Sequence, residues 1–147
     1  MEQVPGVAQV RRLRSRRAID RLDELRAMRG LGEQYTQNAL ALELHISQPA
    51  VSKALEAAAA VDSVLPGFSG ASPYEVAQRY AAGELSREQL VDELARWPYR
   101  PVDPGDGVDW NSYVPSDFAD VTRALSHGLI DDETYCAILT RQNESGL

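Results

Sequence analysis

Residues 36–55 constrain the fold of this chain most, because they fit two short helices and a tight turn and no other regular structure. Thr36 can cap a helix in which Leu40 and Leu44 lie four residues apart, on one face. Ser47 can cap a second helix that carries apolar side chains at the same spacing. The first helix is expected to run to roughly His45 and the second to start at Ser47, so the stretch predicts two helices joined by a sharp turn.

A longer helical pattern precedes this stretch. Apolar side chains recur at helical spacing from about Arg14 to Arg29, at Ala18, Ile19, Leu22, Leu25 and Met28. Gly30 and Gly32 are expected to end this helix, since glycine favours the residue after a helix end. Residues 1–10 are expected to form a loose arm. The first part of the chain therefore predicts three helices.

The second half contains two similar segments. Residues 72–94 and 117–139 match at an offset of 45, and each reads as a helix, a glycine and a second helix that opens with a capping residue. The glycines and caps are Gly83, Gly128, Ser86 and Asp131. A duplication and a chance likeness of two capped hairpins both explain the match, and both predict two helical hairpins. Their core is expected to contain Leu85, Leu90, Leu94, Ile130, Tyr135 and Leu139.

The absence of strand patterns and the placement of turn residues give the fold class and the domains. No segment alternates apolar and polar residues as a half-buried strand does. We therefore predict an all-α fold, a three-helix N-terminal helix-turn-helix module followed by two helical hairpins. The proline, glycine and serine residues of 62–72 predict a linker. The expected domains are 1–62, an arginine-rich arm plus the helix-turn-helix, and 63–147, an acidic hairpin module for dimerisation or partner binding.

Residues 36–55 resemble the helix-turn-helix of bacterial transcription regulators. The run Ser-Gln-Pro-Ala-Val-Ser at 47–52 is similar to the start of the recognition helix in LysR-type and phage-repressor-type regulators. The resemblance implies that six residues pack at the crossing, the turn or the core: Leu40, Ala41, Leu44, Ile46, Val51 and Leu55. One position departs from the pattern. His45 stands where glycine is usual, at a place that often needs a positive φ.

The resemblance implies that the second helix of this pair contacts DNA. A Ser47 cap leaves the start of the helix open to a phosphate. Gln48 can read adenine and Lys53 supplies a cation, which both suit a major groove. An ordinary hairpin with a polar exposed face is the alternative interpretation. The candidate DNA-binding residues are Arg11, Arg12, Arg14, Arg16, Arg17, Thr36, Gln37, Ser47, Gln48, Pro49, Ser52 and Lys53.

Charge is sorted along the chain. The net charge is −7, but residues 1–62 carry nine basic and eight acidic side chains, whereas residues 63–147 carry six basic and fourteen acidic ones. Five arginines lie within residues 11–17, where they either contact phosphates or form a solvated helix face. The first part therefore suits double-stranded DNA, and the acidic part suits a second protein.

The sequence offers no set of catalytic or metal-binding residues. His45, His127 and Cys136 lack the short paired spacings of a zinc site, and no glycine-rich phosphate loop occurs. We therefore expect no enzyme, no metal and no cofactor. Cys136 is expected to be a small buried hydrophobe.

Three features predict a cytoplasmic protein with no membrane partner. No apolar run approaches about 18 residues, the length of a membrane span. Arginines occupy the place of the apolar core of a secretory signal. The single cysteine fits a reducing compartment.

Aromatic residues surround a connector at 98–115 that is rich in proline and glycine. They are Trp97, Tyr99, Trp110, Tyr113 and Phe118. They form either a small core that ties the connector to the hairpins or an exposed groove for a partner.

These patterns predict a sequence-specific DNA-binding transcriptional regulator that binds as a homodimer, a repressor of antitoxin or phage type by analogy. Two alternatives remain open. One is a DNA-recognising assembly protein such as a small packaging subunit. The other is a protein-interaction module whose helix-turn-helix does not bind DNA. Oligomer size separates the first two, and salt-dependent DNA binding separates both from the third.

Overall fold

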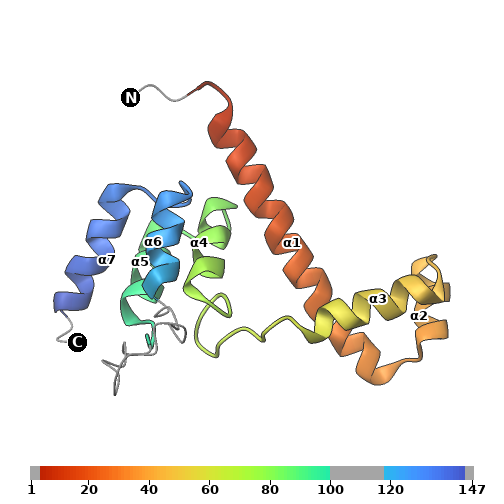
Figure 1. The fold of residues 1–147 in the computed structure, drawn as a ribbon. Coiled ribbons are helices and arrows are strands. Elements are labelled where there is room, and N and C mark those ends of the chain that lie inside the picture. Colours follow the sequence, from red (N-terminus) through yellow and green to blue (C-terminus); the bar gives the residue numbers. More distant parts are fainter. Residues whose placement is uncertain (1–3, 100–117, 145–147) are drawn as a thin grey trace, which may run out of the picture. The chain divides into compact units, whose positions relative to one another are not determined.

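The structure, a computed structural model, describes residues 4–99 and 118–144, in which it places seven helices and no strand (Figure 1). The predicted all-α class is confirmed. The helices are α1 (Val7–Gln34), α2 (Gln37–Leu44), α3 (Gln48–Ala59), α4 (Pro73–Ala81), α5 (Arg87–Arg96), α6 (Phe118–Ser126) and α7 (Asp132–Glu144).

Contacts divide the chain into two compact units. One unit comprises residues 17–63 and is called the α2–α3 unit below. The other, the hairpin unit, comprises residues 1–16 together with 64–147. The predicted boundary near residue 62 lies close to residue 63, where the α2–α3 unit ends and the chain returns to the hairpin unit. The described residues 4–16 differ from the predicted arrangement, because they group with the hairpins.

Helix α1 is longer than the sequence pattern predicts. It begins at Val7 instead of following a loose arm, and it continues through Gly30 and Gly32 to Gln34. Arginine, alanine, leucine and glutamate dominate this stretch, and all four favour helices strongly. A single glycine in a helix interior costs only about 1 kcal/mol relative to alanine, which the neighbouring residues offset.

Gly32 lies where α1 and α3 approach each other. A Cβ atom built on Gly32 would lie 2.7 Å from Cδ2 of Leu55, whereas one built on Gly30 would meet nothing within 4 Å. Glycine at position 32 therefore serves close packing and does not end the helix.

A matched pair of substitutions tests this difference. Gly30→Ala should raise the free energy of unfolding by about 0.8–1 kcal/mol through helix propensity alone. Gly32→Ala gains the same propensity but pushes Leu55 aside, so it should be about 1–2 kcal/mol less stable than Gly30→Ala. Urea unfolding of both variants checks this. Equal stabilisation by the two substitutions would contradict the close packing at Gly32.

Two arginines of α1 cap the end of α3. Arg26 donates from Nε and Nη2 to the carbonyl oxygen of Asp62, at 3.1 and 2.9 Å. Arg29 donates to the carbonyl oxygens of Ala58 and Val61. These carbonyls lie at or just beyond the end of a helix, where they lack partners in the next turn and attract cations.

The four helices of the hairpin unit pack in matched pairs. Helix α4 lies against α6 and α5 against α7, and each hairpin also packs its own two helices together. Of the predicted core, Leu90, Leu94 and Ile130 are buried. Leu85 and Tyr135 pack at the edge of that core, and Leu139 is half-buried.

The two predicted glycine stops are confirmed and have the same geometry. Gly83 and Gly128 have φ of 90° and 77°, which only glycine adopts readily. At the first turn, Gly83 N–H donates to Tyr80 and Glu84 N–H to Arg79. The second turn repeats this pattern 45 residues later, and the pattern is that of a Schellman motif.

The predicted caps of the second helices are confirmed as well. The Ser86 hydroxyl accepts the Gln89 N–H at 3.1 Å, and the Gln89 side chain accepts the Ser86 N–H in return. Asp131 accepts the Thr134 N–H at 2.8 Å. The Thr134 hydroxyl and then its N–H hold the pKa of Asp131 below its ordinary value. This cap therefore stabilises the fold above the ordinary aspartate pKa and weakens as the pH falls through the lowered one.

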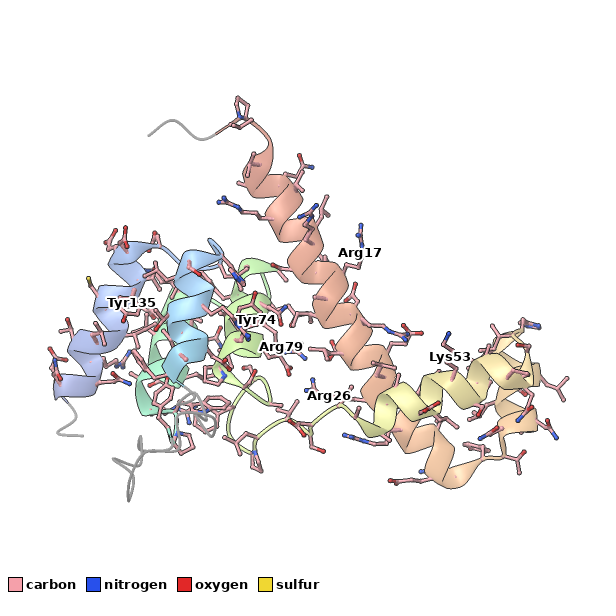
Figure 2. The ribbon with its side chains drawn as sticks, viewed as in Figure 1. Arg17, Arg26, Lys53, Tyr74, Arg79 and Tyr135 are labelled. Carbon is pink, nitrogen blue, oxygen red and sulfur yellow. The ribbon has the colours of Figure 1, made fainter. Side chains whose placement is uncertain are left out.

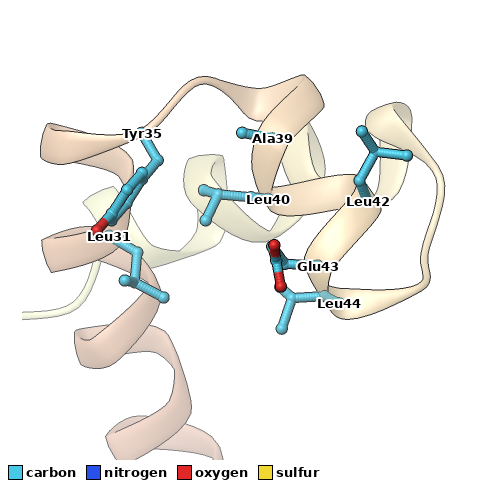
Figure 3. Close-up of a pocket in the computed structure, with 7 residues that line it drawn as sticks. All are labelled: Leu31, Tyr35, Ala39, Leu40, Leu42, Glu43 and Leu44. Carbon is cyan, nitrogen blue, oxygen red and sulfur yellow. The ribbon is translucent and has the colours of Figure 1, made fainter.

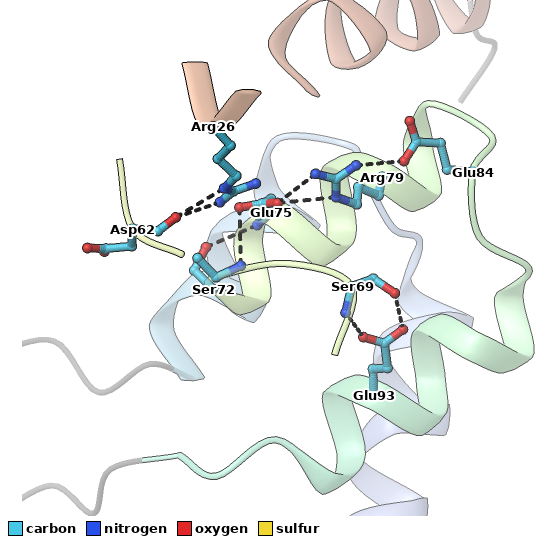
Figure 4. Close-up of polar contacts among 9 residues, drawn as sticks. Arg26, Asp62, Ser69, Ser72, Glu75, Arg79, Glu84 and Glu93 are labelled. Atoms are coloured by element: carbon cyan, nitrogen blue, oxygen red, sulfur yellow. Dashed lines mark hydrogen bonds and ion pairs between the residues drawn. The ribbon is translucent and has the colours of Figure 1, made fainter. Parts of the chain in front are cut away.

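The segment Val64–Ala71, predicted as part of a linker, packs on the hairpin unit and is called the strap below. Glu93, only 6% exposed, accepts the N–H and the hydroxyl of Ser69 (Figure 4). Arg96 donates to the carbonyl oxygen of Gly67 at 2.8 Å and lies 4.2 Å from the ring centre of Phe68. The proline, glycine and serine residues of the strap correctly predict irregular backbone. They carry no information about its tertiary contacts.

Aromatic residues form part of the hairpin core. Trp97 is buried, with its ring 4.6 Å from Phe68 of the strap. Tyr99 and Phe118 lie 5.2 Å apart in an edge-on arrangement. The described members of the predicted aromatic set therefore belong to a core, and Trp110 and Tyr113 lie outside the described residues.

A buried ion pair lies at the start of α4. Arg79 donates from Nη2 and Nε to one carboxylate oxygen of Glu75, at 2.9 and 3.2 Å (Figure 4). The other oxygen of Glu75 accepts the Ala71 N–H of the strap. Arg79 also contacts the half-exposed Glu84 at 2.8 Å. The pair therefore joins α4, the turn after it and the strap.

Candidate nucleic-acid interface

The segment between α2 and α3 is a tight turn, and each of the two helices begins with a side-chain cap. Thr36 caps α2 by accepting the Ala39 N–H at 3.1 Å, and Ser47 caps α3 by accepting the Ala50 N–H at 3.2 Å. His45 has φ 57° and ψ 41°, the only positive φ of a non-glycine residue within the described ranges. The carbonyl oxygen of Ala41 accepts the N–H groups of both His45 and Ile46.

The left-handed conformation of His45 fits the position where the sequence pattern requires a positive φ. Histidine adopts this conformation at a cost of about 1–2 kcal/mol compared with glycine. Two hydrogen bonds to Ala41 on one side and the Ser47 cap on the other hold the backbone there nonetheless. The conformation of the turn is thus set by these hydrogen bonds more than by the backbone preference of His45.

The predicted packing behind α3 is confirmed in part. One buried cluster joins three helices and contains Leu25, Met28, Leu40, Ala41, Val51 and Ala58. Leu55 packs at its edge. The predictions for Leu44 and Ile46 are wrong, because each is 44% exposed. Leu44 is the last residue of α2 and Ile46 lies in the turn after it, so both lie beyond the part of α2 that the shared core covers.

The structure brings two predicted contact residues together. Gln37 and Gln48 are each the first residue of a helix, and Nε2 of Gln48 donates to Oε1 of Gln37 at 2.6 Å. This bond leaves the oxygen and one N–H of the Gln48 amide available to a ligand. Nothing in the sequence pattern singles out this pair, although their equal place in the two helices is a usable signal.

The remaining predicted residues of α3 are exposed. Pro49, Ser52 and Lys53 all face solvent, and Lys53 is labelled in Figure 2. Lys53 forms no hydrogen bond or ion pair with any residue in 4–99 or 118–144. Pro49 has no N–H, and that of Ala50 is taken by Ser47. The start of α3 therefore offers a phosphate mainly the N–H of Gln48.

The arginines of α1 fall into two groups. Arg14, Arg16 and Arg17 are exposed, and within the described part of the chain they form no hydrogen bond or ion pair. Arg11 and Arg12 lie instead at the glycine turns of the hairpin unit. Their guanidinium nitrogens would be 3.1 Å from Cβ atoms built on Gly128 and Gly83.

That placement puts Arg11 and Arg12 beside the ends of two helices, although both are exposed and form no hydrogen bond or ion pair within the described residues. The turns follow the C-terminal ends of α6 and α4, where exposed carbonyl groups favour a positive charge. The predicted set of five arginines is therefore not a single free surface, because two of its members face the hairpin ends.

Other candidate sites receive no support among the described residues. No three His, Cys, Asp or Glu side chains in that part of the chain are placed to hold a metal ion. The prediction for Cys136 is wrong, since the residue is exposed. His127 shares a hydrogen bond of 2.8 Å between its Nδ1 and the Tyr74 hydroxyl. None of the described helices combines the length and the apolarity of a membrane span.

Comparison with known proteins adds no relationship. No protein-family model, no curated protein and no solved structure matches this chain.

Proposed function

We propose that this chain is a sequence-specific transcriptional regulator that binds double-stranded DNA as a homodimer and acts in the cytoplasm. The observation that carries the proposal is the exposed Gln48 amide at the start of α3, held by Gln37. A tight turn fixes α3 relative to α2, and a serine caps its first turn. This combination presents a polar helix start to a groove wide enough for a helix.

Gln48 is the residue proposed to read a base. A glutamine amide can accept from N6 and donate to N7 of adenine at the same time. Its second N–H donates to Gln37, so the amide plane is fixed before DNA arrives. Fixing the side chain in advance reduces the entropy lost on binding.

Lys53 and the exposed arginines are proposed to contact phosphates. Lys53 lies in the same helix as Gln48 and is exposed, so it can reach a backbone phosphate beside the groove. Arg14, Arg16 and Arg17 supply further positive charge. Such contacts position the protein on DNA without reading sequence.

A homodimer follows from the small size of the reading surface. One helix of this kind covers one half-site, and two copies related by two-fold symmetry read two half-sites a helical turn apart. The preferred sequence should then be an inverted repeat.

Selection of bound sequences from a random DNA pool tests the proposal, followed by binding measurements on three variants. Gln48→Ala should weaken binding to the preferred site by about 1–3 kcal/mol and relax the preference at one base pair. Gln37→Ala should cost less, about 0.5–1.5 kcal/mol, because it only frees the Gln48 amide. Lys53→Ala should weaken all sequences alike.

A control separates these effects from general loss of charge or stability. Gln78→Ala removes the same amide from α4 in the hairpin unit and should leave both affinity and preference unchanged. Recovery of no preferred sequence would defeat the proposal. Unchanged binding by Gln48→Ala would show that another residue reads the base.

A further inference from the structure

The α2–α3 unit exposes more apolar surface on one side than its size requires. Five large apolar side chains are uncovered there: Leu31 (37% exposed), Tyr35 (55%), Leu42 (78%), Leu44 (44%) and Ile46 (44%). They come from the end of α1, from α2 and from the turn. Single exposed apolar residues are common, but contiguous groups of this size mark contact surfaces.

Four of these residues, all but Ile46, line a groove. It has a volume of about 550 Å³ and is lined by Leu31, Tyr35, Ala39, Leu40, Leu42, Glu43 and Leu44 (Figure 3). Leu40 points toward Leu31 and Tyr35 across the groove, whereas Leu42 points away from them. Glu43 is the one charged residue of the lining. The groove therefore favours an apolar occupant.

The exposed area suits a second copy of the same surface. The five side chains expose roughly 500 Å² of apolar area, near the upper end for the largest patch on a monomer. Two such surfaces face to face would bury about 1,000 Å², the lower limit for a specific interface. A weak pair is thus within reach of this patch alone.

The shape of the patch also suits a second copy of the same surface. A two-fold contact uses one surface on both partners, so that surface must supply both a protrusion and a hollow. Leu42 is the most exposed of the five side chains, and the hollow beside it has the small Ala39 in its wall. Leu42 of each copy can fill the hollow of the other.

We propose that this groove is the dimer interface, formed by two copies of the chain with Leu42 of each inserted beside Ala39 of its partner. The proposal extends the proposed dimeric regulator by assigning its dimerisation to the α2–α3 unit. The acidic hairpin unit, expected from sequence either to dimerise or to bind a partner, is then available for another protein.

Sedimentation analysis of the full chain without DNA tests this interface, at concentrations from about 5 to 500 μM to bracket the weak affinity of a small interface. The wild type should pass from monomer to dimer. Leu42→Glu should raise the dimer dissociation constant roughly a hundredfold, because it removes a buried apolar side chain and inserts a charge. Ala39→Phe should fill the hollow and raise it about tenfold.

Leu13→Glu is the matched control, since Leu13 is also exposed (52%) but does not line the groove. It should dimerise like the wild type. The proposal is overturned by a monomeric wild type, by a dimeric Leu42→Glu, by equal weakening in Leu13→Glu, or by assembly beyond two copies. If Leu42→Glu unfolds, the dimer dissociation constant of Ala39→Phe alone tests the interface. DNA binding is measured separately, so failure of this interface and failure of the proposed function are distinguishable.

Discussion

Replacing Arg79 with methionine should destabilise the protein by about 3–5 kcal/mol, because it removes a guanidinium that donates two hydrogen bonds to a buried carboxylate. Glu75 is 4% exposed and Arg79 8% exposed, so water cannot replace the lost guanidinium contacts. Glu84, the other partner of Arg79, is half-exposed and can be hydrated after the change. Urea unfolding followed by circular dichroism measures the loss.

A double variant shows whether the buried charge of Glu75 is the cause. Glu75→Gln combined with Arg79→Met removes both charges and keeps an acceptor for Ala71, so it should recover about 1–2 kcal/mol of the loss. Arg21→Met is the control, since its ion pair with Glu24 is more than half exposed on both sides. That control should cost less than about 1 kcal/mol. Similar losses for Arg79→Met and Arg21→Met would mean that Glu75 is hydrated.

Changing Arg14, Arg16 and Arg17 together to glutamine should produce the largest loss of DNA affinity. Each lost phosphate contact lowers the salt slope of binding by about 0.9, so three contacts lower it by about 2.7 and weaken binding at 0.1 M salt on the order of a hundredfold. The preferred sequence should stay the same. Titrations at several salt concentrations measure both quantities.

The control for this variant carries the same change of net charge elsewhere. Arg87, Arg123 and Arg141 lie in the acidic hairpin unit and form ion pairs near its surface. Changing these three to glutamine should leave the salt slope unchanged. A slope that falls equally in both triple variants would indicate a general charge effect instead of contacts by α1.

The local features of the fold follow from the sequence. Capping residues and glycines at Ser47, Ser86, Gly83 and Gly128 act within one turn of chain, so their effect does not depend on tertiary structure. The same holds for the positive φ of His45, which the pattern of the turn predicts. These features locate five of the helix ends and the turn of the candidate interface.

The tertiary contacts were not predictable from these patterns. Glycine normally suggests a helix end, but Gly32 serves a close approach that depends on where α3 lies. A segment rich in proline and glycine suggests a linker, but the strap is held by Glu93 and Arg96 from a distant helix. Leu44 and Ile46 fit a buried pattern, yet the neighbouring helices do not cover them.

The candidate interface was predictable in its residue types but not in its geometry. Gln48, Ser52 and Lys53 are exposed on α3 as the pattern predicts. The bond between Gln37 and Gln48 depends on the angle between two helices, which periodicity does not give. The division of the arginines depends on the glycine turns, which lie more than 70 residues away in the chain.

The membership of residues 1–16 affects how the molecule can be dissected. The chain leaves the hairpin unit after residue 16 and returns to it at residue 64, so the α2–α3 unit is an insertion within the other unit. No single cut separates the two. A fragment beginning at residue 64 lacks Arg11 and Arg12, the side chains beside its two turns. Isolating the hairpin unit intact requires removal of 17–63 and a short bridge that rejoins residue 16 to residue 64.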